Sequence, residues 1–114
     1  MTTIYHNPRC SKSRQTLELL HDQGIEPEIV LYLETPPDAD TLRALLKMLS
    51  IGARDLLRTG EQEYKDNNLK DDQLSEQQLI DAMIQFPKLI QRPIVVSNGK
   101  AAIGRPPESV LDII

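Results

Sequence analysis

The chain has 114 residues, a formal net charge of −4 and a single cysteine. An acidic chain with few aromatic residues is not typical of a nucleic-acid-binding or anionic-membrane-binding protein, which usually carries basic patches. One cysteine excludes an internal disulfide and a cysteine-rich zinc site, and the apolar runs are far shorter than the ~20 residues of a membrane span. Because the N-terminus has no secretory signal pattern, we expect one cytoplasmic domain over residues 1–114.

A short strand and then a helix are predicted near the N-terminus. Residues 3–5 favour a strand, and Pro8 ends it because proline has no N–H to donate to a neighbouring strand. From Ser11 onward, leucines recur at helical spacing until Gly24, a residue typical of the end of a helix. Cys10 therefore lies where the strand ends and the helix begins.

The surroundings of Cys10 favour a reactive thiolate. At the start of a helix, unpaired backbone N–H groups and the helix dipole lower the pKa of a cysteine from about 8.5 to roughly 3.5–7.5. Arg9, Lys12 and Arg14 add positive charge, and Ser13 adds a hydroxyl donor. A lone cysteine is often only a small buried apolar side chain. The basic and polar neighbours favour a nucleophile instead.

A second strand is predicted over Glu28–Tyr32, an apolar and β-branched run bounded by prolines. Strand, helix and strand within this length form a βαβ unit, whose crossover makes the two strands parallel. The following part of the chain predicts an all-helical insertion over about residues 38–86. Its expected elements are helices from Asp38 or Asp40 to Leu49, from Ala53 to Thr59 and from Ser75 to Pro87, with a polar surface connection over Glu61–Asp72.

The last part of the chain returns to strands. Residues 94–97 and 100–103 flank Asn98-Gly99, the strongest two-residue hairpin signal, and a short helix is expected over Ser109–Ile114. This order predicts an α/β fold: a four-stranded mixed sheet (β-α-β, then β-β-α) with the helical insertion between its halves. That is the thioredoxin or glutaredoxin plan, which places a cis-proline before the third strand, so Pro93 is the candidate.

Three arginines stand at the ends of predicted elements. Arg58 is near the end of a short helix, Arg92 precedes the third strand and Arg105 follows the fourth. The planar guanidinium binds an oxyanion through two parallel hydrogen bonds, so three such residues near a thiolate are suited to an oxyanion site. Individually, most arginines are solvated or form weak surface pairs, and it is only in the expected fold that these three would come together.

Six segments of the sequence together resemble the glutaredoxin-linked arsenate reductase family. They follow the family's order across nearly the whole chain: residues 5–10, 13–14, 31–34, 56–58, 91–96 and 105–106. The resemblance implies a thioredoxin-like fold in which Cys10 attacks arsenate. This chain has Ser11-Lys12 where well-known members have Gly-Thr, and it ends at Ile114 without their longer C-terminal tail, as does a shorter arsenate-reductase-like subgroup.

The resemblance also implies roles for other groups. Arg58, Arg92 and Arg105 would bind the arsenate oxyanion. His6 would help to set the ionisation of the thiol, and Ser13 would hydrogen-bond the thiolate. No cofactor would be bound; glutathione would be the co-substrate and glutaredoxin the partner that restores the thiol, because the chain has no second cysteine.

Three other functions of a protein with a single reactive cysteine can be tested against the sequence. A cysteine phosphatase loop has arginine six positions after the cysteine, where this chain has Thr16. A non-enzymatic regulator of the Spx type usually has Cys-x-x-Cys, where this chain has Ser13. A general glutathione-dependent thiol oxidoreductase stays open, because it would need Cys10 but not all three arginines. The only two histidines and the one cysteine are spread over residues 6–21 and offer no convincing metal site. A histidine beside a strand end, such as His6, is also often only structural, and His21 is expected at the surface of the first helix.

Overall fold

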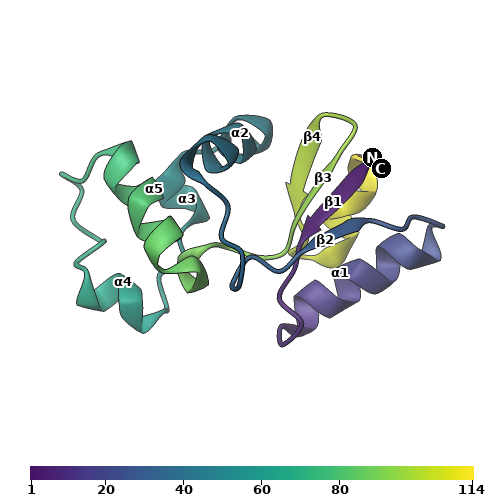
Figure 1. Cartoon of the computed structure of the whole chain (residues 1–114), viewed down its shortest axis with the longest axis horizontal. Coiled ribbons are helices and arrows are strands. Elements are labelled where there is room, and N and C mark those ends of the chain that lie inside the picture. Colours follow the sequence, from purple (N-terminus) through teal and green to yellow (C-terminus); the bar gives the residue numbers. More distant parts are fainter. The chain divides into compact units, whose positions relative to one another are not determined.

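The chain forms two units in the computed structural model, which describes all residues from 1 to 114. The first unit combines Met1–Thr35 with Arg92–Ile114 and contains the β-sheet. The second unit, Pro36–Gln91, contains helices and no strand (Figure 1). No helix in either unit combines the length and apolar character that crossing a membrane requires.

The first unit is built on four strands: β1 (Thr2–Tyr5), β2 (Glu28–Val30), β3 (Ile94–Ser97) and β4 (Lys100–Ile103). They lie in the order β2-β1-β3-β4. β1 runs parallel to β2, whereas β1 with β3 and β3 with β4 are antiparallel. The predicted four-stranded mixed sheet is therefore confirmed.

Helix α1 (Ser11–Asp22) connects β1 to β2 and contacts the C-terminal 3-10 helix η2 (Pro107–Asp112). Ile4 in β1 lies opposite Val95 in β3, and both are fully buried. With Leu20 of α1 and Val110 of η2 they form the core of this unit. Burying each such side chain stabilises the fold by about 1.5–3 kcal/mol, so this core holds α1 against the sheet.

The turn between β3 and β4 matches the sequence prediction, whereas β2 and the final helix differ from it. Asn98 and Gly99 adopt φ values of 57° and 75°, as a two-residue hairpin turn of the primed kind requires. β2 is shorter than expected, because the N–H groups of Glu34 and Thr35 bond to the carbonyl of Leu31 and turn the chain away. The final helix is also shifted: it is a 3-10 helix over Pro107–Asp112, where a short helix over Ser109–Ile114 was expected.

The second unit contains helices α2 (Ala39–Leu49), α3 (Ala53–Leu56), α4 (Gln62–Asp66) and α5 (Glu76–Gln85), and the 3-10 helix η1 (Pro87–Leu89). Asp38 caps α2, as expected, by accepting the N–H of Thr41 at 2.8 Å. Ser75 and Gln78 form a capping box at the start of α5, where the helix was expected to begin. The apolar faces of these helices are buried, chiefly through Leu42, Leu45, Leu56, Ile80 and Met83.

The structure adds one element to this unit and shortens another. The segment Glu61–Asp72, predicted to be mostly a surface connection, contains a short helix, α4, none of whose residues is buried. The helix that was expected to reach Thr59 stops at Leu56, because Leu57 forms an antiparallel bridge with Ile90. In the same bridge region the N–H of Arg58 donates to the carbonyl of Leu89 at 2.8 Å. The backbone of Arg58 is therefore fixed by pairing rather than by a helix.

Candidate active site

The loop between β1 and α1 is organised around Asn7. Its carbonyl accepts the N–H of Cys10 at 3.0 Å, and its side-chain Oδ1 accepts the N–H of Arg9 at 3.0 Å. Its own N–H donates to Oγ of Ser13 at 3.0 Å. The first two bonds fold the loop on itself, and the third ties it to the first turn of α1. Cys10 thereby occupies the N-cap position of that helix.

Cys10 is 7% exposed, and its pKa lies below the ordinary value of a thiol. Burial alone raises the pKa of Cys10, because a thiolate is costly to desolvate. The opposing effects are larger in sum: the backbone N–H of Ser13, the charge of Arg92, the backbone N–H of Lys12 and a hydrogen bond from Arg92. The helix start and one arginine therefore favour the ionised form of the sulfur.

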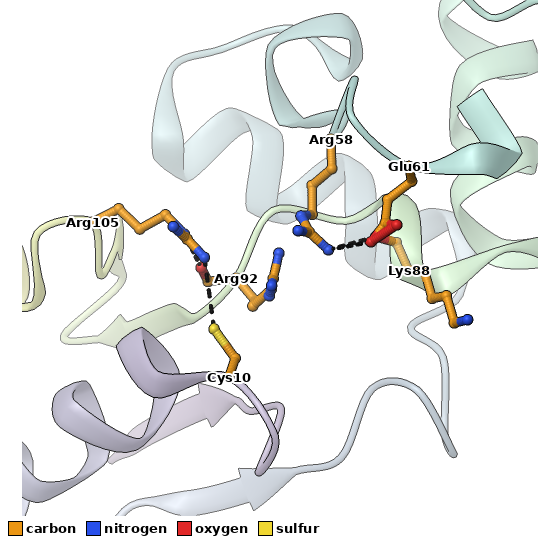
Figure 2. Close-up of polar contacts among 6 residues, drawn as sticks. All are labelled: Cys10, Arg58, Glu61, Lys88, Arg92 and Arg105. Carbon is orange, nitrogen blue, oxygen red and sulfur yellow. Dashed lines mark hydrogen bonds and ion pairs between the residues drawn. The ribbon is translucent and has the colours of Figure 1, made fainter. Parts of the chain in front are cut away.

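Arg105 contacts the sulfur directly. Its Nη2 atom lies 3.6 Å from Sγ of Cys10, and its Nε donates to the carbonyl of Arg92 at 2.8 Å (Figure 2). The peptide bonds before Pro93 and Pro106 are both cis, which confirms the prediction for Pro93 and adds a second cis-proline that was not predicted. Pairing of β3 with β4 brings the two arginine-bearing segments together beside Cys10.

His6 is buried and contacts Ser13. Its Nδ1 lies 2.6 Å from Oγ of Ser13, and because that oxygen already accepts the N–H of Asn7, we assign the hydroxyl proton to the bond with His6. Burial and then the charge of Arg14 lower the pKa of His6. His6 is therefore held neutral near neutral pH, and it reaches the thiol through Ser13.

Tyr32 is a site residue that the sequence reasoning did not single out. Its side chain is 1% exposed, and it hydrogen-bonds the side chain of Asn7. Burial raises the pKa of Tyr32 to about 12, and the charges of Arg92, Cys10 and Arg105 all act on the phenol. Tyr32 belonged to an apolar run that was predicted as a strand, so nothing in the sequence marked its hydroxyl as part of a site.

Arg58 belongs to the second unit and has partners of its own there. Its Nη1 forms an ion pair with Oε1 of Glu61 at 2.6 Å and a longer bond with the carbonyl of Lys88 at 3.4 Å (Figure 2). Of the residues that the sequence singled out, the first unit brings together Cys10, His6, Ser13, Arg92 and Arg105.

Two further features bear on what the site can hold. No group of three or more His, Cys, Asp or Glu side chains is arranged to hold a metal ion. A cavity of about 300 Å³ lies against the loop between β1 and α1, and Cys10 does not line it. That cavity is lined by His6, Asn7, Pro8, Arg9, Leu31, Leu33 and Glu34. The groups around the sulfur are arginines and backbone N–H donors, which suit an anion.

The fold and this site together define a thioredoxin-like protein with one thiol at the start of its first helix and two arginines beside that thiol. A comparison with family models gives the particular family. The ArsC family model matches residues 5–113, and the chain belongs to the ArsC family.

Relatives of known sequence and structure match over nearly the whole chain. The uncharacterized protein YfgD of Escherichia coli (strain K12) is 65% identical, over 97% of this chain and 94% of its own length. An arsenate reductase of Escherichia coli is 49% identical, over 98% of this chain and 79% of its own length. The structure of an arsenate reductase from Vibrio cholerae is 53% identical, covers 99% of this chain and 97% of that one, and superposes with a TM-score of 0.97.

Proposed function

We propose that this chain is an arsenate reductase in which Cys10 is the nucleophile. The observation that carries the proposal is the contact between the Cys10 sulfur, whose pKa is lowered, and the guanidinium of Arg105 at 3.6 Å. A thiolate beside a fixed cation can attract an oxyanion despite the charge repulsion between the two anions. Membership of the ArsC family, and relatives named as arsenate reductases, support the same substrate.

The first chemical step forms a bond between sulfur and arsenic. The thiolate of Cys10 attacks the arsenic(V) centre, and one arsenate oxygen leaves as water after it is protonated. The arsenic stays in the +5 state in this covalent adduct. Arg92 and Arg105, together with Arg58 as the third anion-binding arginine, would stabilise the negative charge on the remaining oxygens.

The reduction needs two external thiols, because Cys10 is the only cysteine in the chain. The thiolate of glutathione attacks the Cys10 sulfur, the sulfur–arsenic bond breaks, and its electron pair leaves with arsenic as arsenite. Cys10 then carries a mixed disulfide with glutathione, and a glutaredoxin thiol removes the glutathione and restores the Cys10 thiolate. A cytoplasmic location, where thiols stay reduced, is part of the proposal.

Within the loop, His6 and Ser13 would support the thiolate rather than touch the substrate. Ser13 contributes its backbone N–H to the sulfur, and its hydroxyl is held by His6 and Asn7. Because both partners fix the Ser13 side chain, they would also fix the first turn of α1, whose N–H groups favour the ionised thiol.

The test is an assay in which arsenate reduction consumes NADPH through glutaredoxin, glutathione and glutathione reductase. The wild-type protein should give NADPH consumption that depends on arsenate, and Cys10→Ser should abolish it. Absence of arsenate-dependent turnover with every glutaredoxin tried would contradict the substrate. If an Arg58, Arg92 and Arg105 triple alanine variant keeps the full rate of disulfide exchange, a general thiol oxidoreductase would describe the protein better.

A further inference from the structure

The two chain segments that surround Cys10 are basic. Residues 1–17 and 92–107 contain Lys and Arg but no Asp or Glu, although the whole chain has a net charge of −4. Arg9, Lys12 and Arg14 are exposed and follow or precede Cys10 closely in sequence. Arg105 is also exposed, and its Nη2 lies 3.6 Å from the sulfur (Figure 2). The positive charge around the thiol is therefore a local feature that the overall composition does not explain.

Carboxylates do not neutralise these cations within the first unit. Nη1 of Arg14 donates to the carbonyl of Pro8 at 2.8 Å, which holds its guanidinium against the loop between β1 and α1. Lys12 lies in the first turn of α1, a turn that contains no acidic residue. Arg9 and Glu34 line the same cavity but form no ion pair with each other. The positive charge of all three basic side chains is therefore open to a partner molecule.

A protein thiol that restores Cys10 has to approach this part of the molecule. The inference rests on the proposed function, in which Cys10 carries a mixed disulfide with glutathione after arsenite has left. The thiolate of the partner attacks the glutathione sulfur, the disulfide bond breaks, and its electron pair returns to Cys10 as a thiolate. Because the new sulfur–sulfur bond is only about 2 Å long, the surface around the partner's thiol must face the surface around Cys10.

We propose that a basic surface around Cys10 docks a protein of the glutaredoxin class whose own thiol is surrounded by acidic residues. This basic surface consists of Arg9, Lys12, Arg14 and Arg105. Opposite charges on two protein surfaces mainly accelerate their encounter, and they do so less as the salt concentration rises. Arg9 and Lys12 are the residues to change, because neither side chain bonds to another residue of the chain. The basic surface selects among protein reductants by their charge.

The experiment measures how fast a glutaredoxin reduces the mixed disulfide between Cys10 and glutathione. The mixed disulfide is prepared by reaction of the protein with oxidised glutathione. The reductants are a glutaredoxin with acidic residues around its thiol and a variant of that glutaredoxin in which those acidic residues are changed to lysine. Dithiothreitol, a small uncharged thiol, reduces the same disulfide in parallel. Division of each glutaredoxin rate by the dithiothreitol rate removes any change in the reactivity of the disulfide itself.

We expect the acidic glutaredoxin to react at least about tenfold faster than its lysine variant at low salt, the lower end of electrostatic effects on association rates. The advantage should shrink between about 0.1 M and about 1 M salt, as the screening length falls from about 10 Å to about 3 Å. Lys12→Glu should reduce the advantage several-fold, and Arg9→Glu added to it should reduce it further. Lys100→Glu is the matched control, because Lys100 is exposed beside the Asn98-Gly99 turn at the opposite end of the sheet, and it should keep the advantage.

Equal rates for the two glutaredoxins with the wild-type protein, or equal effects of Lys12→Glu and Lys100→Glu, would overturn the docking role of the basic surface. Circular dichroism establishes that each variant keeps the wild-type fold. The proposed function is tested separately, because the reduction of the mixed disulfide involves no arsenate. If arsenate turnover depends on Cys10 but the two glutaredoxins react equally fast, the docking inference alone fails. If no glutaredoxin supports arsenate turnover, the substrate assignment fails, and the disulfide rates still decide the docking surface.

Discussion

Nη2 of Arg105 lies 3.6 Å from Sγ of Cys10, although 95 residues separate them in the chain. The sheet makes this contact, because β3 and β4 pair with each other and β3 pairs with β1, which leads into the Cys10 loop. The contact matters for chemistry, since a cation beside a thiolate both stabilises it and attracts an anionic substrate. It also links the thiol to Arg92, whose carbonyl accepts from Nε of Arg105.

Arg92 and Arg105 should contribute differently to the ionisation of Cys10. Arg92 lowers the pKa of Cys10 by its charge and by a hydrogen bond, whereas the Arg105 contact is long. We expect Arg92→Ala to raise the pKa of Cys10 more than Arg105→Ala does, as measured by the pH dependence of alkylation. Each variant should raise the arsenate KM by about tenfold or more, the effect of losing one charge-assisted hydrogen bond. An equal or reversed order of the two pKa changes would contradict this.

His6 should make the fold less stable in acid. The pKa of His6 in the folded protein lies below 6.5, the value expected for the unfolded chain. As the pH falls from 6.5 toward the lowered pKa, the unfolded chain binds a proton that the folded protein does not. The free energy of unfolding should therefore fall in that window, by at most about 1.4 kcal/mol per pH unit, and be unaffected by His6 above it.

Chemical denaturation at several pH values tests this prediction. His6→Gln should flatten the acid dependence of the unfolding free energy, because glutamine does not bind a proton in this range. His21→Gln changes an exposed histidine whose Nε2 lies 3.7 Å from Oε2 of Glu26, and it controls for the loss of a histidine. An unchanged acid dependence in His6→Gln would show that another group is responsible.

Tyr32→Phe should weaken the Cys10 loop. Oδ1 of Asn7 accepts from Arg9, so we assign its amide N–H₂ to the hydroxyl oxygen of Tyr32, and phenylalanine would remove the protein partner of that partly buried donor. We expect a loss of about 0.5–1.5 kcal/mol in unfolding free energy, the net contribution of a typical hydrogen bond, and slower alkylation of Cys10. Tyr64→Phe, in the second unit, is the control. Wild-type alkylation and stability in Tyr32→Phe would exclude this supporting role.

Gly104→Ala should displace the segments that carry Arg92 and Arg105, because the space around Gly104 is tightly packed. A Cβ at Gly104 would lie 2.8 Å from Cγ of Pro93 and would also clash with Thr16 of α1. Overpacking of this kind costs about 1–3 kcal/mol, and relief of the clash would displace the segment that carries Arg105. Thermal unfolding and arsenate KM should both reveal the change. Gly60→Ala, where a Cβ meets nothing within 4 Å, should leave both unchanged.

Much of the first unit could be predicted from local patterns. The apolar strands, the Asn98-Gly99 turn and the helix that begins after Cys10 each depend on neighbouring residues, and the structure confirms them. The cis peptide before Pro93 was predicted from the fold plan and is present. The second cis-proline, Pro106, has no sequence signal of its own, because most X-Pro bonds are trans.

The errors occurred where distant residues decide local structure. The helix from Ala53 stops early because Leu57 pairs with Ile90, a partner that local helical periodicity does not reveal. Tyr32 was missed for a similar reason, because it becomes informative only through its contact with Asn7. An isolated tyrosine in an apolar run gives no such signal.

The most direct test of the account is the pH dependence of Cys10 alkylation in the substrate-free protein. Cys10 is the only cysteine, so iodoacetamide reports this thiol without background from another. The account predicts a midpoint below that of cysteine in an unstructured peptide, because the start of α1 and Arg92 together outweigh the effect of burial. A midpoint at or above the peptide value would contradict it, since the thiol would then lack the ionisation on which attack at arsenic depends.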